Sequence, residues 1–253
     1  MGAHVDPSDP LEAAGERGAG ILQMFLSNPQ GWKAPEPRDD AAELRESPVS
    51  VIVHSPYLIN VCAGNNRIRI PSRKILNDTL QAAEAISADA VVVHGGHVSD
   101  DEDPVEGFVR WKKALDQVES DMPIFIENTA SGDRAVGREI EMIARLWEVV
   151  GDTGVGFCLD TCHAWAAGEP LDGLVDRVMA ATGRIDLLHC NGSRDPFDSR
   201  RDRHDKLLQG HIPVDQIAEI VRNTTCPVIL ETPGGASDHI AEIDLVRSYT
   251  DGI

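Results

Sequence analysis

The chain has 253 residues, of which 42% are hydrophobic and 26% are charged, a composition typical of a globular protein and not of a disordered, fibrous or membrane-spanning one. Its formal net charge of −19 argues against a nucleic-acid partner, because an acidic surface repels phosphate. That argument loses force if several carboxylates hold divalent cations, since the bound ions then reverse the charge of the site.

The sequence also indicates a compartment. No apolar run approaches the roughly 20 residues that a membrane crossing needs, and the N-terminal residues lack the basic and apolar regions of a signal peptide. We therefore expect a cytoplasmic protein with no membrane contact. The cysteines are odd in number and form no C-x-x-C pair, so we expect reduced core thiols rather than disulfides or metal ligands at Cys62, Cys158, Cys162, Cys190 and Cys226.

Short apolar runs alternate along the chain with longer amphipathic stretches, the pattern typical of a parallel sheet with helices outside it. Asp9 and Pro10 predict the cap and first turn of a helix, and Pro71 is interpreted as the opening of another. The predicted strands are 2–5, 21–25, 49–54, 90–94, 123–127, 155–160, 184–189 and 228–231, and further helices are predicted over 104–119, 138–150, 171–181, 213–222 and 239–248.

These elements predict an α/β protein, a single (β/α)8 TIM-barrel domain that spans residues 1–253. About eight strands is the number that a closed barrel of this type needs. No repeat, low-complexity block or linker divides the chain. The polar stretch 191–210 is longer than a simple connection, and loops of that length are usually functional or mobile.

Six of the predicted strands end in a residue type that binds metal ions in proteins. In a TIM barrel the C-terminal ends of the strands meet at one rim, where active sites are assembled. Imidazole and carboxylate groups without thiolate suit Zn²⁺ or Mn²⁺ in a catalytic site. The six residues are His54, His94, Glu127, Asp160, His189 and Glu231.

Two short motifs supply three more candidate ligands. His163 follows a strand end in Asp160-Thr161-Cys162-His163, and Asp202-Arg203-His204 places a carboxylate and an imidazole on one side of the chain if that segment is extended. Nine ligands exceed what one or two ions need, so three ions that share a carboxylate are the economical assignment. Clustered divalent ions of this kind predict hydrolysis of a phosphate ester.

Taken in order along the chain, these residues resemble the endonuclease IV family nearly from end to end. The D-T-C-H-A segment after a V-G-x-C-x-D strand is specific in this setting, and the whole series is more specific than any one motif. The motifs are His54-Ser55-Pro56-Tyr57-Leu58-Ile59-Asn60, Val93-His94-Gly95-Gly96-His97, Ile126-Glu127-Asn128-Thr129-Ala130, Cys158-Leu159-Asp160-Thr161-Cys162-His163-Ala164, Asp202-Arg203-His204 and Leu230-Glu231-Thr232-Pro233.

The resemblance implies a centre of three zinc ions per chain, with Mn²⁺ as an alternative at one position. It implies that Glu127 and Glu231 act in catalysis together with a metal-bridging hydroxide, and that Glu231 handles the proton. The implied ligands are His54, His94 and Glu127 for the first ion, Glu127, Asp160, His189 and Glu231 for the second, and His163, Asp202 and His204 for the third.

The activity implied by the resemblance is that of a zinc-dependent endodeoxyribonuclease of base excision repair. Such an enzyme hydrolyses the phosphodiester 5′ to an abasic site and leaves a 3′-hydroxyl and a 5′-deoxyribose phosphate, and we also expect 3′-end phosphodiesterase activity. The implied partner is duplex DNA that contains abasic sites. We expect the protein to act as a monomer.

Several residues are candidate DNA contacts. Tyr57 and Leu58 match the pair that family members insert into the duplex, and an abasic nucleotide flips out at low cost because no base pair is broken. Gln30 stands where many members have an arginine that enters the base stack, so stacking beside the lesion should be weaker or different. For contacts with DNA phosphates we expect Arg67, Arg69, Arg201 and Arg203.

Two other functions stay open at this point. A sugar isomerase or epimerase of the same barrel superfamily would use Glu127, Asp160, His189 and Glu231 for one ion, but would leave the other candidate ligands without a purpose. A non-catalytic protein that binds damaged DNA could keep the same ligands. Substitution of Glu127 or Glu231 would distinguish such a binding protein from an enzyme. An enzyme would lose DNA cleavage, whereas a binding protein would keep its affinity for damaged DNA.

Overall fold

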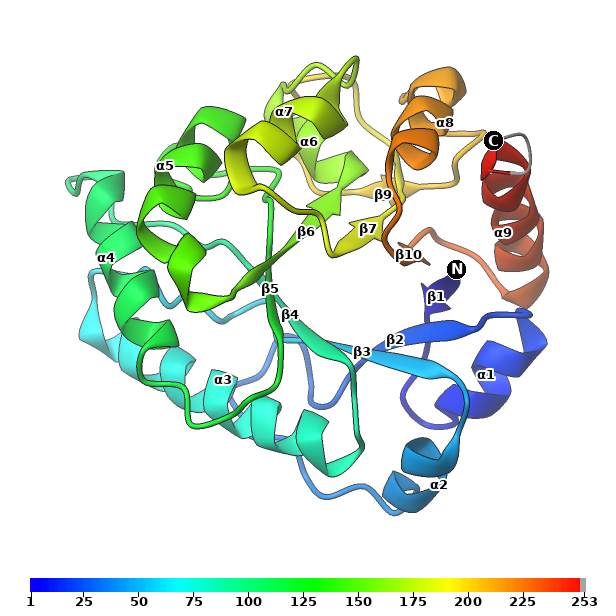
Figure 1. Ribbon diagram of the computed structural model, residues 1–253, viewed down its shortest axis with the longest axis horizontal. Helices are drawn as coiled ribbons and strands as arrows, with labels where there is room; N and C mark the ends of the chain where they lie inside the picture. Colours follow the sequence, from blue (N-terminus) through cyan, green and yellow to red (C-terminus); the bar gives the residue numbers. More distant parts are fainter. Residues whose placement is uncertain (251–253) are drawn as a thin grey trace.

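Parallel strands close into a barrel at the centre of the computed structural model, which describes residues 1–250 (Figure 1). The last strand, β10, pairs with both β7 and β1 and so closes the ring. The strands of the barrel are β1 (Gly2–His4), β2 (Ile21–Phe25), β3 (Ser50–His54), β4 (Ala90–His94), β5 (Ile124–Glu127), β6 (Gly156–Asp160), β7 (Leu187–His189) and β10 (Val228–Leu230).

This architecture confirms the predicted fold class. Every predicted strand is present, and each one ends within one residue of its predicted C-terminal end. The largest difference is at β7, which begins at Leu187 instead of residue 184. There the Arg184 side chain binds the carboxylate of Asp186, which also accepts a hydrogen bond from Phe157 N at 2.9 Å, and residues 184–186 lie outside the regular strand.

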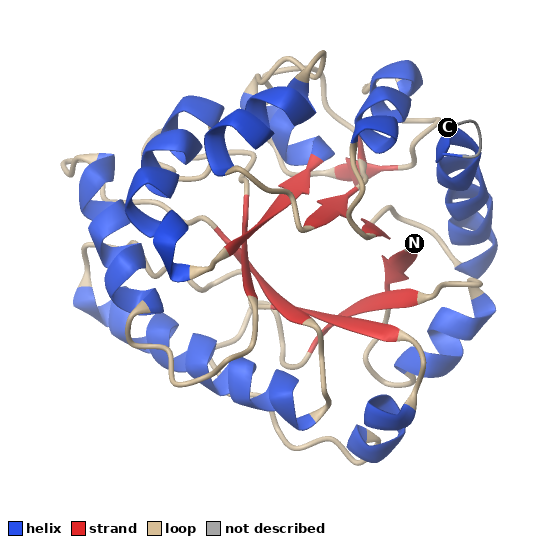
Figure 2. Ribbon diagram, in the orientation of Figure 1, coloured by secondary structure: helices blue, strands red, loops and turns tan. Residues whose placement is uncertain are grey.

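Helices form an outer layer around the strands (Figure 2). They are α1 (Pro10–Glu16), α2 (Ala41–Glu46), α3 (Asn66–Ala85), α4 (Pro104–Leu115), α5 (Ile140–Val150), α6 (Thr161–Ala167), α7 (Leu174–Thr182), α8 (Val214–Asn223) and α9 (Ala236–Thr250), with a 3-10 turn, η1 (Gly151–Thr153), after α5. The buried faces of α4, α5, α7 and α8 are largely apolar at helical spacing. Within the described residues, no helix combines the length and the hydrophobicity that a membrane crossing requires.

The interpretation of Pro71 as the opening of a helix is wrong. Helix α3 begins at Asn66, because the Asn65 side chain accepts a hydrogen bond from Arg67 N at 2.9 Å and caps the first turn. Pro71 lies inside the helix, where its ring nitrogen has no hydrogen to donate. Arg67 and Arg69 therefore lie on the first turn of α3.

Three elements occur where no regular structure was predicted: α2, α6 and a small antiparallel hairpin formed by β8 (Gly192–Ser193) and β9 (His204–Asp205). Helix α6 follows β6 directly, and the Asp160 side chain caps it by accepting a hydrogen bond from His163 N at 2.7 Å. Nearly all residues of α6 are buried. The helix therefore lacks the amphipathic pattern by which helices are recognised in a sequence.

Side chains along each strand alternate between the barrel interior and the layer beneath the helices. The interior contains a small apolar cluster: Ile21, Ile52, Ala90, Val92, Cys158, Leu187 and Ile229, with Phe125 packed against it. Two residues further along each strand, the side chain faces inward again, at the C-terminal mouth. This alternation brings the six strand-end residues named above to one place.

Two backbone segments pack closely against each other beside His94, at the C-terminal mouth of the barrel. A methyl group added at Gly95 would lie 3.0 Å from Gly137 Cα, and one at Gly137 would lie 3.2 Å from Gly95 Cα. Gly95 also accepts, through its carbonyl, a hydrogen bond of 2.7 Å from the indole nitrogen of the fully buried Trp111. The backbone next to His94 thus has little freedom to move.

We expect the substitution Gly95→Ala to lower the free energy of unfolding by about 1–3 kcal/mol, the usual cost of overpacking, and the melting temperature by about 2–12 °C. The matched control is Gly20→Ala, because an added methyl there meets nothing within 4 Å. Thermal unfolding of both variants checks the prediction. Equal melting temperatures for the two variants would contradict it.

Candidate metal centre

The nine residues predicted to bind metal ions gather at the C-terminal mouth of the barrel, around a cavity of about 520 Å³. Seven of them line that cavity, and Asp160 and His189 lie fully buried beside them. The pairing of the strands explains part of this arrangement, because His94 is the register partner of Glu127 and Asp160 is the register partner of His189.

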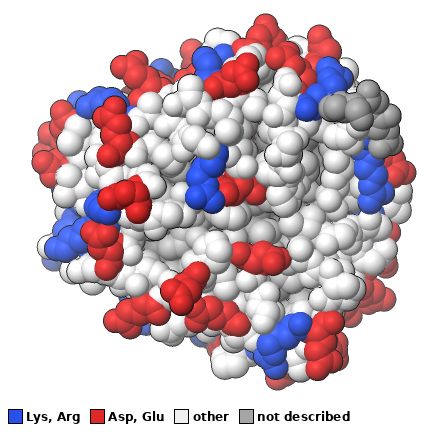
Figure 3. All heavy atoms as spheres, in the orientation of Figure 1, with Lys and Arg blue, Asp and Glu red and all other residues white. Residues whose placement is uncertain are grey.

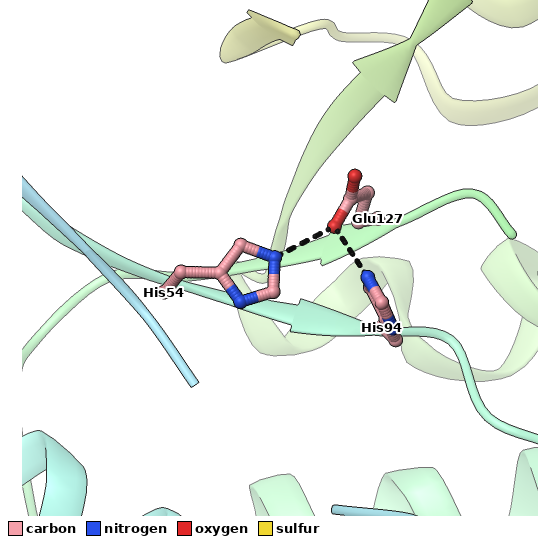
Figure 4. A group of neighbouring side chains, drawn as sticks. All are labelled: His54, His94 and Glu127. Carbon is pink, nitrogen blue, oxygen red and sulfur yellow. Dashed lines mark hydrogen bonds and ion pairs between the residues drawn. The ribbon is translucent and has the colours of Figure 1, made fainter. Parts of the chain in front are cut away.

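Two imidazoles and one carboxylate form the first group. His54 Nε2 lies 3.1 Å from Glu127 Oε2, and His94 Nε2 lies 3.2 Å from the same oxygen. Figure 4 shows both rings pointing at this oxygen from β3 and β4. Glu127 and His54 are buried, whereas His94 is about one-fifth exposed toward the cavity.

The second group shares Glu127 with the first. His189 Nδ1 lies 3.0 Å from Glu127 Oε1, 3.3 Å from Glu231 Oε2 and 3.9 Å from Asp160 Oδ2. One oxygen of Glu127 therefore faces the first group while the other faces the second. These four residues offer donor atoms that all lie within 4.8 Å of one another.

The third group joins the two short motifs of the sequence. His163 Nε2 lies 3.1 Å from Asp202 Oδ1, and His204 Nε2 lies 3.2 Å from the same oxygen. His163 stands on α6, and His204 stands on β9, where it pairs with Ser193. Helix α6 and the hairpin, which were not predicted, thus place these residues beside the other two groups.

The imidazole nitrogens are arranged as metal ligands require. The Nδ1 atoms of His54, His163 and His204 lie 2.7, 2.8 and 3.4 Å from the carbonyl oxygens of Ser55, Asn128 and Glu231. A proton on each Nδ1 satisfies that contact and leaves the lone pair of Nε2 directed into the centre.

Two of these inward-facing nitrogens have no hydrogen-bond partner. His163 Nε2 and His204 Nε2 are buried and unpartnered, although a carboxylate oxygen of Asp202 lies close to both. A lone pair that faces a carboxylate oxygen is repulsive unless a proton or a metal ion lies between them. The donor set therefore fits divalent cations of the kind that imidazole and carboxylate ligands hold.

The pKa values of the acidic and imidazole groups also favour binding of divalent cations. Burial alone would raise the pKa of Glu127, but the imidazoles of His189 and His94 outweigh it and hold the pKa well below its usual value. Burial likewise would lower the pKa of His189, but Glu231 and Glu127 raise it to about 9. Divalent ions would take the place of these imidazole protons, so their binding should release protons.

Thiols lie near two of the groups but are poor candidate ligands. Cys158 adjoins Glu127 and His189, and Cys162 adjoins Asp202 and His204. Burial raises the pKa of Cys158 well above its usual value and that of Cys162 to about 12, which keeps both thiols protonated. All five cysteines, which lie in the described part of the chain, are free thiols, as the sequence analysis expected.

Two buried asparagines, neither of them predicted to belong to the site, hydrogen-bond to the acidic residues Asp160 and Glu231. Asn191 Nδ2 donates to Asp160 Oδ2 at 2.7 Å, and its Oδ1 accepts from Glu231 N at 2.8 Å. Asn128 Oδ1 accepts from Asp160 N at 2.6 Å. Their position one or two residues after a predicted strand end was the available signal.

The candidate DNA-stacking residues lie beside this centre. Tyr57 is 50% exposed, and its ring is stacked on that of His94 with the centroids 5.7 Å apart. Tyr57 and the half-buried Leu58 line a second cavity of about 390 Å³ together with Trp32, which is 45% exposed and was not considered as a contact. Gln30 is exposed but does not line either cavity.

The four arginines that are candidate contacts for DNA phosphates differ in how many groups of the protein they already bind. Arg203 makes a bidentate ion pair with the buried Asp195, and Arg201 Nη1 lies 3.6 Å from the same carboxylate. Arg69 donates to the carbonyls of Ala63 and Gly64, whereas Arg67 is exposed. Among the described residues, the face in Figure 3 carries scattered acidic and basic groups and no continuous basic surface.

Comparison with known proteins identifies the family to which the chain belongs. Residues 11–249 match the family model described as xylose isomerase-like TIM barrel. A protein of Mycobacterium tuberculosis named "Probable endonuclease 4" is 57% identical over 242 residues, which cover 95% of this chain and 96% of the relative. A protein of Mycobacterium leprae with the same name is 54% identical over 253 residues and covers 100% of this chain and 99% of the relative.

Solved structures agree with the sequence comparison. Endonuclease IV from Thermus thermophilus superposes with a TM-score of 0.85 at 28% identity and covers 100% of this chain and 99% of that one. A D-tagatose 3-epimerase-like protein superposes with a TM-score of 0.78 at 19% identity, covering 99% and 97% of the two chains, a likeness of fold alone. The chain therefore belongs to the endonuclease IV family, within the xylose isomerase-like TIM barrels.

Proposed function

We propose that the chain is a zinc-dependent deoxyribonuclease that hydrolyses the phosphodiester 5′ to an abasic site in duplex DNA. The products are a 3′-hydroxyl and a 5′-deoxyribose phosphate, and the same site would remove blocked 3′ ends as a phosphodiesterase. The single observation that carries this proposal is the set of three ligand groups around one cavity, two of which share the Glu127 carboxylate.

Each ligand group would hold one zinc ion: His54, His94 and Glu127 the first, Glu127, Asp160, His189 and Glu231 the second, and His163, Asp202 and His204 the third. Mn²⁺ is an alternative at one position. When bound, such ions lower the pKa of a coordinated water and stabilise the charge that develops on the phosphate and on the leaving oxygen. The three ions would also offset part of the acidic charge of the chain.

The protein groups have two tasks in this proposal. Glu127 spans the first two groups and fixes their separation. Glu231 would accept the proton, because its side chain lines the cavity and is 14% exposed there. Burial would raise the pKa of Glu231, but the His189 and His204 imidazoles lower it, so the carboxylate is ionised at neutral pH.

The protein would recognise its substrate by the way in which the DNA duplex deforms at an abasic site. Tyr57 and Leu58 project from the β3–α3 segment at the edge of the cavity, where they could fill the gap left by a flipped abasic nucleotide. Arg67 is the most available of the four candidate phosphate contacts, since Arg69 and Arg203 are engaged within the protein. Arg201 and Arg203 would reach phosphate oxygens only if they share or leave Asp195.

We expect the substitution Tyr57→Ala to weaken binding of abasic duplex roughly 5- to 150-fold, because stacking of an aromatic ring on a base contributes about 1–3 kcal/mol. Fluorescence anisotropy with an abasic duplex measures this effect. Met179→Ala, at an exposed apolar residue on α7, is the control. Unchanged affinity of Tyr57→Ala, with normal zinc content, would exclude the stacking role.

The proposed function is tested by incubating the purified protein with a duplex that carries one tetrahydrofuran abasic analogue. Cleavage is mapped at nucleotide resolution, and the zinc content is measured on the same sample. We expect cleavage 5′ to the lesion with about three metal ions per chain. Binding without cleavage would favour a damage-binding protein, and one metal ion without cleavage would favour a sugar isomerase or epimerase.

Three further expectations belong to the same proposal. Residues 1–253 would act as one catalytic domain, the protein would be a monomer, and it would work in the cytoplasm on chromosomal DNA. Light scattering of the purified protein in the presence and absence of abasic duplex checks the oligomeric state. A dimeric mass in both conditions would contradict the expectation of a monomer.

A further inference from the structure

Gln23 is a polar residue in the middle of an otherwise apolar strand, and its side chain lies at the base of the candidate metal centre. It stands on β2 between Leu22 and Met24, which belong to the outer core, and is itself fully buried. The alternation along the strand directs its side chain into the barrel interior, just above Ile21. A buried amide at this position costs free energy unless all its polar atoms are satisfied.

The amide of Gln23 is satisfied by two residues of the centre and by His4. Its Oε1 lies 2.8 Å from His189 Nε2, and its Nε2 donates to Glu231 Oε1 at 2.6 Å. The same Nε2 lies 3.0 Å from His4 Nδ1, so its second hydrogen also has an acceptor. One side chain thus joins two of the candidate ligands of the second ion.

The orientation of the amide follows from its partners. If the oxygen and nitrogen of Gln23 were exchanged, the oxygen would face the carboxylate of Glu231 at 2.6 Å, and two acceptors at that distance repel each other. Oε1 must therefore face His189. Because Oε1 only accepts hydrogen bonds, His189 carries its proton on Nε2, and Nδ1 is the nitrogen directed to Glu127, Asp160 and Glu231.

His189 differs in this respect from the other imidazoles of the centre. His54, His163 and His204 have the outer nitrogen next to a backbone carbonyl, and they direct Nε2 inward. His189 directs Nδ1 inward, and its outer nitrogen meets a side chain. The backbone cannot be removed by substitution, whereas Gln23 can, so the contribution of such an outer contact is measurable here.

We propose that Gln23 is a positioning residue of the metal centre, which sets the tautomer of His189 and the orientation of Glu231 so that both can bind the second ion. The proposal rests on the proposed function, since it assumes that these two residues are metal ligands. Groups that orient metal ligands in this way typically contribute about 10- to 100-fold to metal affinity. Gln23 does not touch the substrate in this role.

The test replaces Gln23 by methionine, which has a similar volume but cannot make the hydrogen bonds. Zinc content is measured after equilibration with a graded series of a competing chelator. We expect wild-type protein to retain about three ions over a range in which Gln23→Met retains about two, with the affinity for one ion reduced about 10- to 100-fold. Equal retention of all ions by the two proteins would overturn the proposal.

A second variant separates positioning from a loss of folding. Met24→Ala removes a fully buried side chain from the same strand on the opposite face, and it should lower the melting temperature without changing zinc retention. If Gln23→Met is less stable than Met24→Ala but keeps its zinc, Gln23 is only a structural residue. If the wild-type protein itself binds no zinc, the proposed function fails, and this failure is visible before any variant is compared.

A double substitution tests whether Gln23 acts through His189. In a His189→Ala background only the contact of Gln23 with Glu231 remains, so adding Gln23→Met should reduce zinc retention by a smaller factor than it does in the wild-type protein. Fully additive losses in the double variant would show that Gln23 does not act through His189, which contradicts this part of the proposal.

Discussion

Replacing Glu127 by glutamine is expected to reduce the rate of cleavage at an abasic site by at least about 1,000-fold, which corresponds to about 4 kcal/mol of transition-state stabilisation. Glu127 is the carboxylate whose two oxygens face different ligand groups, one toward His54 and His94 and the other toward His189. Glutamine keeps the shape of the side chain but removes the negative charge between two ions. Both ions should therefore bind more weakly.

This expectation is checked by measuring kcat/KM on an abasic duplex together with zinc content. Glu148→Gln, at an exposed residue of α5, is the control for the change in net charge. Circular dichroism establishes that the Glu127 variant is folded. Cleavage within tenfold of wild type by a folded Glu127→Gln protein would be incompatible with a shared carboxylate ligand.

Removing the metal ions is expected to abolish cleavage and to lower the melting temperature by at least about 10 °C. A ligand present at about 1,000 times its dissociation constant stabilises the folded state by about 4 kcal/mol, and a chain of this size loses about 2–4 °C per kcal/mol. Without ions, four carboxylates and five imidazoles stay crowded at the barrel mouth. Protonation of the imidazoles compensates for only part of the lost attraction.

Differential scanning calorimetry of the protein before and after chelation, and after zinc is restored, measures this effect. Restored zinc should recover both the melting temperature and the activity, whereas Mg²⁺ should not, because it prefers an octahedral set of oxygen ligands. Chelation that abolishes activity but leaves the melting temperature unchanged would mean that the ions bind a site that is already stable without them.

The strand ends were predictable because two local signals coincide there. An apolar run of β-branched residues such as Val91, Val92 and Val93 identifies the strand, and the polar residue that follows, His94, marks its end. Barrel topology then implies that such ends meet, without any knowledge of side-chain packing. For this reason six candidate ligands and the fold class could be inferred from one sequence.

Elements without such a local signal were not predicted. Helix α6 is buried nearly all round and so lacks amphipathic spacing. The hairpin of β8 and β9 has only two residues in each strand, and its pairing spans a loop of ten residues between Ser193 and His204. The start of α3 depended on the cap at Asn65, which outweighed the preference of proline for the first turn of a helix.

The sequence by itself determined the residue types of the centre and their order along a barrel, since strand periodicity and chain connectivity are local properties. Only the tertiary structure decided which oxygen of Glu127 faces which ligand group, which imidazole nitrogen faces inward, and that Arg203 is held by Asp195. It also assigned Gln23 to the centre through contacts with residues 166 and 208 positions away in the chain. Such contacts depend on the packing of distant segments, and no spacing in the sequence encodes them.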